Sequence, residues 1–309
     1  MTALLLAFPG CAALAEKLCD GLAATKGDIA WRHFPDGESL VALDADCAGH
    51  DVALTATLRD PDRLALPLLF AARTARELGA RSVGLVAPYL AYMRQDAQFK
   101  KGEAVSAVHF AAFLAWTFDW LVTVDPHLHR NPDLGALLRI PAMAVPSTRS
   151  VADWIAAQVA DPVLVGPDAE SAQWLEPLAK ATGAPLVVLE KKRSGDRAVA
   201  ISAPDAAAVA GRTPVLVDDI VSTGHTMAEA IVRLCEAGAR APVCIAVHAV
   251  FAEGAEQRLR DAGAARIATT NTIEHPTNAI DIAPVLIAAV AQMLKGESTR
   301  SSASEDAGR

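Results

Sequence analysis

The sequence predicts an α/β protein built from two similar domains, each a mainly parallel sheet flanked by helices. Short apolar runs rich in β-branched residues alternate with stretches of helical pattern. The same order of elements starts again after residue 145. The 309 residues are 52% hydrophobic but only 5% aromatic, which is typical of an aliphatic α/β core and is long enough for two domains.

The first domain is expected at residues 1–145. Its opening stretch, "MTALLLAFPGCAALA", indicates a strand and the start of a helix. Later strands are expected in "DVALTATL", "SVGLVAPYL" and "WLVTVDPH", with helices at Asp62–Leu78 and Ala104–Phe118 between them. This alternation predicts βαβ units and parallel strands. The stretch "HFPDGESL" predicts a tight turn between two strands, with Asp36 and Glu38 exposed.

The second domain is expected at residues 146–295. It starts with a helix from about Val151, and its strands are expected in "PVLVGPD", "PLVVLEKKR", "PVLVDDI" and "PVCIAVHAV". A last helix at about Ile280–Leu294 is expected to pack against the first domain. The tail at 296–309, "GESTRSSASEDAGR", lacks apolar residues that could be buried, which predicts a disordered segment.

Charge and cysteine content exclude several classes of protein. A net charge of −8 argues against a general nucleic-acid binder, and no apolar run is long enough to span a membrane. The five cysteines are odd in number and lack metal-type spacing, which favours reduced thiols in the cytoplasm. The motifs GxxxxGK[ST], GxGxxG, HExxH and GxSxG are absent, so standard nucleotide kinases and hydrolases lose support.

The stretch "VLVDDIVSTGHTM" places two carboxylates beside a hydroxyl-rich turn. Asp218 and Asp219 end a predicted strand, and the N–H groups of residues 222–226 could bind an anion where a helix starts. Thr226 followed by Glu229 predicts a capping box for that helix. Because carboxylates repel phosphate, a phosphorylated polyol would satisfy both halves of the stretch. A polar turn with a capping threonine is the simpler alternative.

Cationic and amide side chains follow two further predicted strands. Lys191, Lys192 and Arg193 in "LEKKRSGDR" are adjacent cations in an acidic chain, which suggests an anion that arrives with the substrate. Arg94 in "YMRQD" can bind phosphate through two hydrogen bonds, and Gln95 beside it offers both a donor and an acceptor. A solvated basic strand end is the alternative for the first cluster, and an ordinary loop is the alternative for the second.

Carboxylates and imidazoles follow two more strands. Asp125, His127 and His129 in "VDPHLHR" could help to hold a metal or contact phosphate, and Asp168 closes another strand in the same way. Single residues of these types at strand ends are more often caps or turn residues.

Taken in order, "FPDGE", "PYLAYMRQD", "DPH", "GPD", "EKKR" and "VDDIVSTGHT" resemble the motifs of the ribose-phosphate pyrophosphokinases, also called phosphoribosyl pyrophosphate synthetases, from about Phe34 to Asn271. The resemblance implies phosphoribosyltransferase-like domains, with ATP bound by the first and ribose 5-phosphate by the second. It implies a cytoplasmic transferase that moves the diphosphoryl group of Mg-ATP to ribose 5-phosphate. Its partners would be these substrates and at least one further copy of the chain, without nucleic acid or membrane.

The same resemblance implies roles for individual residues. The catalytic residues would be Lys191 and Arg193. Ribose 5-phosphate would contact Asp218, Asp219, Ser222, Thr223, Gly224, His225 and Thr226. ATP would contact Phe34, Asp36, Glu38, Arg94, Gln95 and Asp96, the first three reaching across from a neighbouring subunit. His127 and Asp168 would be linked to Mg²⁺.

Three departures from the family pattern stand out. The loop Ser222-Thr223-Gly224-His225-Thr226 is similar to archaeal-type members rather than to common bacterial ones. Residues 97–99 interrupt a basic run that often follows "RQD" in the family. Ala48 stands where many bacterial members carry a regulatory arginine, so control by ADP or phosphate is expected to be absent or differently built.

Two other functions remain open from the residues alone. A phosphoribosyltransferase would account for the stretch around Asp218, but it has no use for "FPDGE" and "YMRQD" in a separate domain. An inactive paralogue that regulates a true synthetase by co-assembly would not need the clustered charges at strand ends.

Overall fold

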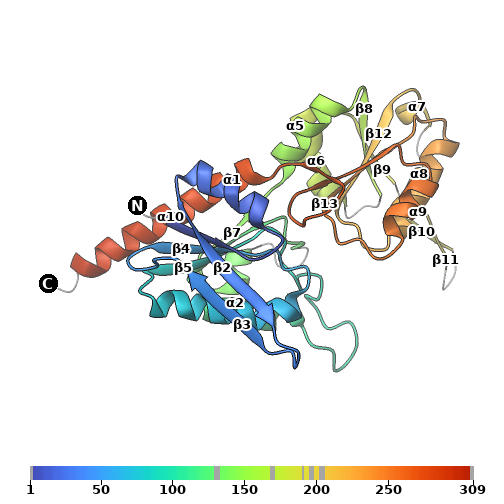
Figure 1. Ribbon diagram of the computed structural model, residues 1–309. Helices are drawn as coiled ribbons and strands as arrows, with labels where there is room; N and C mark the ends of the chain where they lie inside the picture. The colour runs from blue at the N-terminus through green and yellow to red at the C-terminus, as the bar shows by residue number, and fades with distance from the viewer. Residues whose placement is uncertain are drawn as a thin grey trace. The chain divides into compact units, whose positions relative to one another are not determined.

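The computed structural model describes residues 3–128, 133–167, 171–189, 191–194, 198–201 and 206–306 (Figure 1), and the side chains of 172–174, 191–201, 206 and 297–306 lie outside that description. By its internal contacts the chain divides into two units. Unit 1 comprises Met1–Pro146 and Ala283–Arg309, and unit 2 comprises Ser147–Ile282. Each contains a mainly parallel sheet flanked by helices, so the predicted α/β fold is confirmed.

The sheet of unit 1 has seven strands in the order β3-β2-β1-β4-β5-β6-β7. All neighbours are parallel except β2 and β3, which form the expected antiparallel hairpin. The strands are β1 (Ala3–Ala7), β2 (Thr25–His33), β3 (Ser39–Asp44), β4 (Asp51–Thr55), β5 (Ser82–Ala87), β6 (Trp120–Val124) and β7 (Ala142–Val145).

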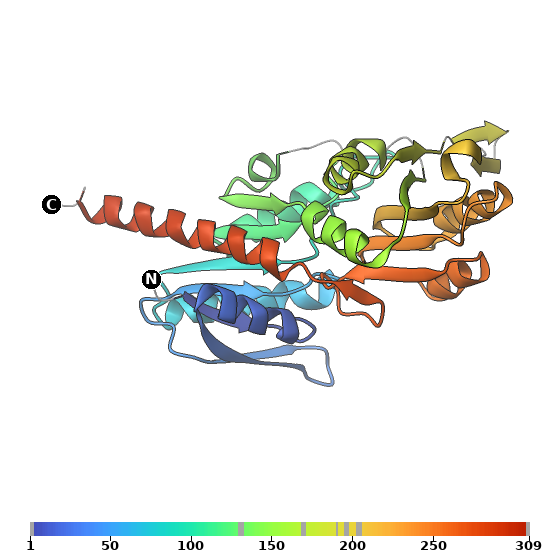
Figure 2. The same cartoon turned by 90° about the horizontal axis from the view of Figure 1, so that it is seen from above.

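Helices cover both faces of this sheet. Those of unit 1 are α1 (Ala12–Leu22), α2 (Pro61–Glu77), α3 (Ser106–Thr117), α4 (Leu134–Leu138) and α10 (Ala283–Asp306). Figure 1 shows α1 and α10 together on one face and α2 on the other, and Figure 2 shows α10 running beside the sheet. The last helix continues to Asp306, past its expected end at Leu294, and the disordered tail expected at 296–309 stays a prediction.

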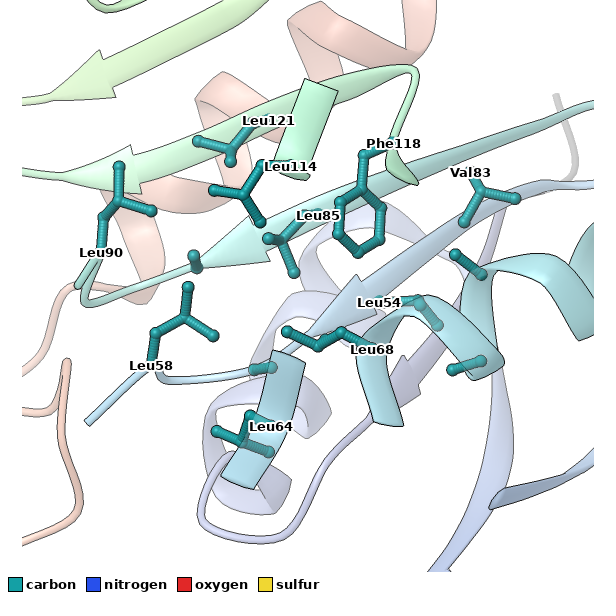
Figure 3. Packing of buried hydrophobic residues seen from close by; sticks show 14 of the residues in the cluster. Leu54, Leu58, Leu64, Leu68, Val83, Leu85, Leu90, Leu114, Phe118 and Leu121 are labelled. Atoms are coloured by element: carbon teal, nitrogen blue, oxygen red, sulfur yellow. The ribbon is translucent and has the colours of Figure 1, made fainter. Parts of the chain in front are cut away.

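The core of unit 1 is aliphatic, as its composition predicts. Figure 3 shows Leu54 and Leu85 of neighbouring strands against Leu68 of α2, and all three side chains are fully buried. Burial of one such side chain contributes about 1.5–3 kcal/mol. Gly84 of β5 lies beside the buried Trp120 of β6, and a Cβ at this glycine would stand 1.9 Å from Trp120 Cε2. The indole therefore requires glycine at that position.

Unit 2 has a six-stranded parallel sheet in the order β15-β14-β13-β12-β8-β9, plus a separate two-stranded sheet of β10 and β11. Its strands are β8 (Pro162–Gly166), β9 (Leu186–Val188), β10 (Lys191–Ser194), β11 (Ala198–Ile201), β12 (Thr213–Ile220), β13 (Val243–His248), β14 (Arg266–Thr270) and β15 (Asn278–Ile280). Its helices are α5 (Thr148–Gln158), α6 (Ala172–Thr182), α7 (Ala206–Val209), α8 (His225–Glu236) and α9 (Ala255–Asp261). Among the described residues, no helix combines the length and apolarity needed to cross a membrane.

Candidate functional site

In unit 2 the carboxyl end of strand β12 carries the two predicted aspartates. Residues 215–217 are buried, whereas Asp218 and Asp219 are half-buried. The N–H of Asp219 donates to Asp218 Oδ1 at 3.0 Å, and the N–H of Ile220 donates to Asp219 Oδ1 at 2.7 Å. Each carboxylate is thus held by the backbone of the next residue. Two acceptors are fixed where the strand ends, which is where ligands bind in open α/β sheets.

A short loop joins β12 to helix α8. The N-cap of α8 is Gly224, whose φ of 72° lies in the left-handed region, and the helix begins at His225. The predicted capping box at Thr226 and Glu229 is therefore wrong, because the helix starts earlier and a glycine has no side chain to cap it. The first N–H groups of α8 are left without an N-cap side chain, an arrangement in which a helix start can bind an anion.

The segment that follows β13 supports this loop. The N–H of Ala252 donates to the Ser222 carbonyl at 3.0 Å, and Arg258 Nη1 of α9 donates to the Thr223 carbonyl. A Cβ at Gly224 would lie 3.4 Å from the Ala255 carbonyl oxygen. The loop is therefore packed against α9.

In unit 1 the loop after β5 presents the predicted Arg94, Gln95 and Asp96. Met93 is buried and anchors the loop, while Arg94 and Gln95 are exposed. The N–H of Gln95 donates to the Tyr92 carbonyl at 2.9 Å. The arginine and the amide therefore project from an anchored turn rather than from a loose loop.

Tyr92 joins this turn to the scaffold. Its φ is 67°, its ring lies 4.8 Å from that of Phe110, and its hydroxyl donates to Asp62 Oδ1 of α2. The hydrogen bond to Asp62 raises the pKa of Tyr92, and burial and the Asp62 charge raise it further. The hydroxyl therefore stays protonated and able to donate at neutral pH.

The backbone is strained just after β6. Asp125 and His127 have φ values of 34° and 49°, and neither is glycine. Such residues cost about 1–3 kcal/mol each, and they concentrate at functional sites. The N–H of Asp125 is held by the Val145 carbonyl at 3.1 Å, and the N–H of His127 by the Asp125 carbonyl at 2.9 Å. Because β5 and β6 are neighbours, His127 and the Arg94 loop share one edge of the sheet.

The turn between β2 and β3 has its own internal hydrogen bonds. The N–H of Phe34 donates to the Glu38 carbonyl at 2.7 Å, and the N–H of Glu38 donates to Asp36 Oδ1 at 3.1 Å. The Arg32 guanidinium carbon lies 4.3 Å from the centre of the Phe34 ring. This turn follows β2, which β1 and β4 separate from β5. Three strand spacings, roughly 14 Å, therefore separate the end of β2 from the end of β5 within the sheet.

The remaining predicted residues are only partly described. Lys191 and Arg193 lie in β10, which pairs with β11, rather than at the end of β9 as expected. Strand β11 in turn lies against α8. Nothing is described of the side chains of Lys191 and Arg193, and His129 and Asp168 lie outside the described residues.

Comparison with known proteins accounts for both units. Residues 3–116 match the N-terminal domain of ribose phosphate pyrophosphokinase, and residues 134–284 match the phosphoribosyl transferase domain. The ribose-phosphate pyrophosphokinase of Methanopyrus kandleri is 32% identical over 279 residues, covering 90% of this chain and 94% of the relative. This chain belongs to the ribose-phosphate pyrophosphokinase family.

Further relatives agree with this assignment. The ribose-phosphate pyrophosphokinase of Sulfolobus acidocaldarius is 33% identical over 276 residues, covering 87% of this chain and 93% of the relative. A crystal structure of phosphoribosylpyrophosphate synthetase from Mycobacterium smegmatis superposes with a TM-score of 0.83 at 25% identity, covering 96% of this chain and all of that one. The resemblance read from the six motifs is confirmed, and the archaeal origin of similar relatives agrees with the form of the loop at residues 222–226.

Two supporting residues escaped sequence reasoning. Arg258 contacts a candidate loop from a position that no motif marks, and Tyr92 lies within "YMRQD" but was assigned no role from the sequence. Arg258 lies 35 residues from Thr223 in the chain, and Tyr92 lies 30 residues from Asp62. Only the packing of α9 on its loop, and of the β5 loop on α2, brings these pairs together.

Proposed function

We propose that this protein transfers the diphosphoryl group of ATP to the anomeric hydroxyl of ribose 5-phosphate, giving phosphoribosyl diphosphate and AMP. The observation that carries the proposal is the match to ribose-phosphate pyrophosphokinases along nearly the whole chain. A phosphoribosyltransferase would explain unit 2 but not the match at residues 3–116. The comparisons likewise favour an active synthetase over an inactive regulatory paralogue.

The ribose 5-phosphate site is proposed at the end of β12. Asp218 and Asp219 would accept hydrogen bonds from the ribose hydroxyls, while the 5-phosphate would bind the N–H groups and hydroxyls of residues 222–226. The start of α8 has no capping side chain, which supports a phosphate site there, because the positive end of a helix attracts an anion. The carboxylates at the end of β12 suit the hydroxyls of such a ligand, and the N–H donors of the loop suit its phosphate.

The ATP site is proposed on the carboxyl edge of the unit 1 sheet. Arg94 would bind phosphate oxygens through two hydrogen bonds, and Gln95 and Asp96 would offer further polar contacts. Phe34, Asp36 and Glu38 would contact the adenine of the ATP that a neighbouring subunit binds. The separation of β2 from β5 within the sheet supports that arrangement. We therefore propose that the functional protein is at least a dimer.

The residues present suit a magnesium ion whose ligands come mainly from the phosphates of the nucleotide. Within the described part of the chain, no three His, Cys, Asp or Glu side chains gather to hold a metal. Protein sites for Mg²⁺ in phosphoryl-transfer enzymes usually supply only one or two ligands and leave the rest to phosphates and water. His127 and Asp168 are the proposed protein contacts. When bound, the cation would offset phosphate charge during transfer.

The reaction makes one phosphorus–oxygen bond and breaks another. The anomeric oxygen bonds to the β-phosphorus, the bond from that phosphorus to the bridging oxygen of the α-phosphate breaks with its electron pair going to AMP, and the hydroxyl proton is released. A loose transition state puts most of the demand on charge stabilisation. Lys191 and Arg193 are the proposed catalytic residues because they would hold positive charge against the transferring group.

We place the protein in the cytoplasm. All five cysteines are free thiols, and Cys235 is exposed, which fits a reducing compartment. Burial raises the pKa of the Cys47 and Cys244 thiols, which keeps both in the unreactive protonated form.

Nucleotide chromatography tests the proposal. Purified protein with ATP, Mg²⁺ and ribose 5-phosphate is expected to form AMP, and AMP should fail to appear when the sugar phosphate is omitted. Folded protein that binds ribose 5-phosphate yet forms no AMP would instead support the transferase or the inactive paralogue.

A further inference from the structure

A second layer of contacts lies behind the loop of residues 222–224. It comes from the turn after β13 and from α9, which Figure 1 shows beside α8 in orange. The N–H of Ala252 holds the Ser222 carbonyl at 3.0 Å, and Arg258 Nη1 holds the Thr223 carbonyl. Two consecutive carbonyls of the loop are thus bound from the same segment.

This contact fixes the direction of the loop's donors. In a trans peptide the C=O and the N–H of the same unit point in opposite directions. Binding the carbonyls of Ser222 and Thr223 on the α9 side therefore turns the N–H groups of Thr223 and Gly224 to the opposite side. Those N–H groups are among the ones that would receive a phosphate at the start of α8.

Arg258 differs from the other arginine of α9. Arg260 pairs with Glu256 at 2.5 Å along the helix, an ordinary surface ion pair. Arg258 is half-buried, and within the described part of the chain its guanidinium is paired with no carboxylate and instead donates to a loop carbonyl. Its positive charge is therefore not neutralised locally, and it adds to the attraction of the loop for an anion.

We infer that Arg258 is a positioning residue for the phosphoryl group of ribose 5-phosphate, acting by turning the N–H groups of Thr223 and Gly224 toward that group without touching the substrate itself. This inference rests on the proposed function for the identity of the ligand. The long stem and forked donor of arginine reach the carbonyl from α9, whereas lysine offers a single point donor.

Three variants test the inference. Arg258→Met keeps the aliphatic stem and removes the donor and the charge, Arg258→Lys restores a charge, and Arg260→Ala is the matched control on the same helix. For Arg258→Met we expect KM for ribose 5-phosphate to rise about tenfold, or about 1.4 kcal/mol, with KM for ATP nearly unchanged. The KM of Arg258→Lys for ribose 5-phosphate should fall between those of Arg258→Met and the unaltered protein. The KM of Arg260→Ala should equal that of the unaltered protein.

Calorimetric titration of ribose 5-phosphate separates this inference from the proposed function. If the unaltered protein binds the sugar phosphate but makes no AMP, the proposed function fails, and a weaker affinity in Arg258→Met still supports the inference. If both Arg258 variants bind ribose 5-phosphate as tightly as Arg260→Ala does, the inference is overturned. Should Arg258→Met fail to fold, Arg258→Lys decides: an intermediate affinity supports the inference, and an unchanged one overturns it.

Discussion

Gly224→Ala tests whether the backbone of the loop before α8 determines both stability and ligand binding. Gly224 has a φ of 72°, and the left-handed conformation costs an L-residue about 1–2 kcal/mol. An added Cβ would lie 3.4 Å from the Ala255 carbonyl oxygen, which is ordinary contact, so strain rather than overlap sets the effect. After allowance for the reduced freedom of the unfolded chain, we expect a net loss of about 1 kcal/mol, roughly fivefold in the folding equilibrium constant.

Gly211→Ala is a matched control for this substitution. Gly211 has a φ of 70° and open space around its missing side chain, and it lies in the turn before β12 rather than in the loop. Urea unfolding should show similar losses of stability in both variants. Only Gly224→Ala should raise KM for ribose 5-phosphate, because only that loop is proposed to bind the phosphate. Equal KM values in the two variants, or an unchanged stability of Gly224→Ala, would refute the reasoning.

Four more substitutions test the scaffold and the site. Asp51→Ala removes a buried carboxylate that accepts hydrogen bonds from the exposed Arg81 and from the buried Ser82, so it should lower the unfolding free energy by about 1–3 kcal/mol in urea titrations and leave both KM values unchanged. Tyr92→Phe should raise KM for ATP several-fold in steady-state kinetics, since it frees the Arg94 loop from α2, and an unchanged KM would show that the hydroxyl does not position that loop. Burial raises the pKa of Cys244 from 9.0 to about 12, so the unfolding free energy should fall above pH 9 by up to about 1.4 kcal/mol per pH unit, and Cys244→Ala should flatten that decline. Lys191→Ala should lower kcat at least about 100-fold in the AMP assay without lowering the melting temperature, whereas comparable kcat would remove Lys191 from the catalytic residues.

Local pattern was enough to predict most of the elements that carry the site. Residues 215–217 are apolar and are followed by two aspartates, so both the strand and its polar end were readable from the sequence. The hairpin turn around Gly37 was predictable for the same reason, since "PDG" has the backbone preferences of a tight turn. In both places neighbouring residues determine the conformation.

The errors arose where distant contacts decide the local structure. Helix α8 begins at His225 because Gly224 adopts a left-handed conformation against Ala255. The residues around Thr226 alone do not indicate that packing. Residues 191–194 leave the expected strand because they pair with β11 instead of the central sheet. The bond from Arg258 to Thr223 depends on how α9 packs, so no local motif predicts it.

In the proposed reaction the anomeric oxygen of ribose 5-phosphate attacks the β-phosphorus of ATP. This step can be followed with ribose 5-phosphate labelled with ¹⁸O at the anomeric hydroxyl and mass spectrometry of the products. The label should be retained in phosphoribosyl diphosphate, in the oxygen that joins the sugar to the diphosphate, with one AMP formed for each molecule of product. Loss of the label from that product, or ADP in place of AMP, would rule out attack by the anomeric oxygen on the β-phosphorus.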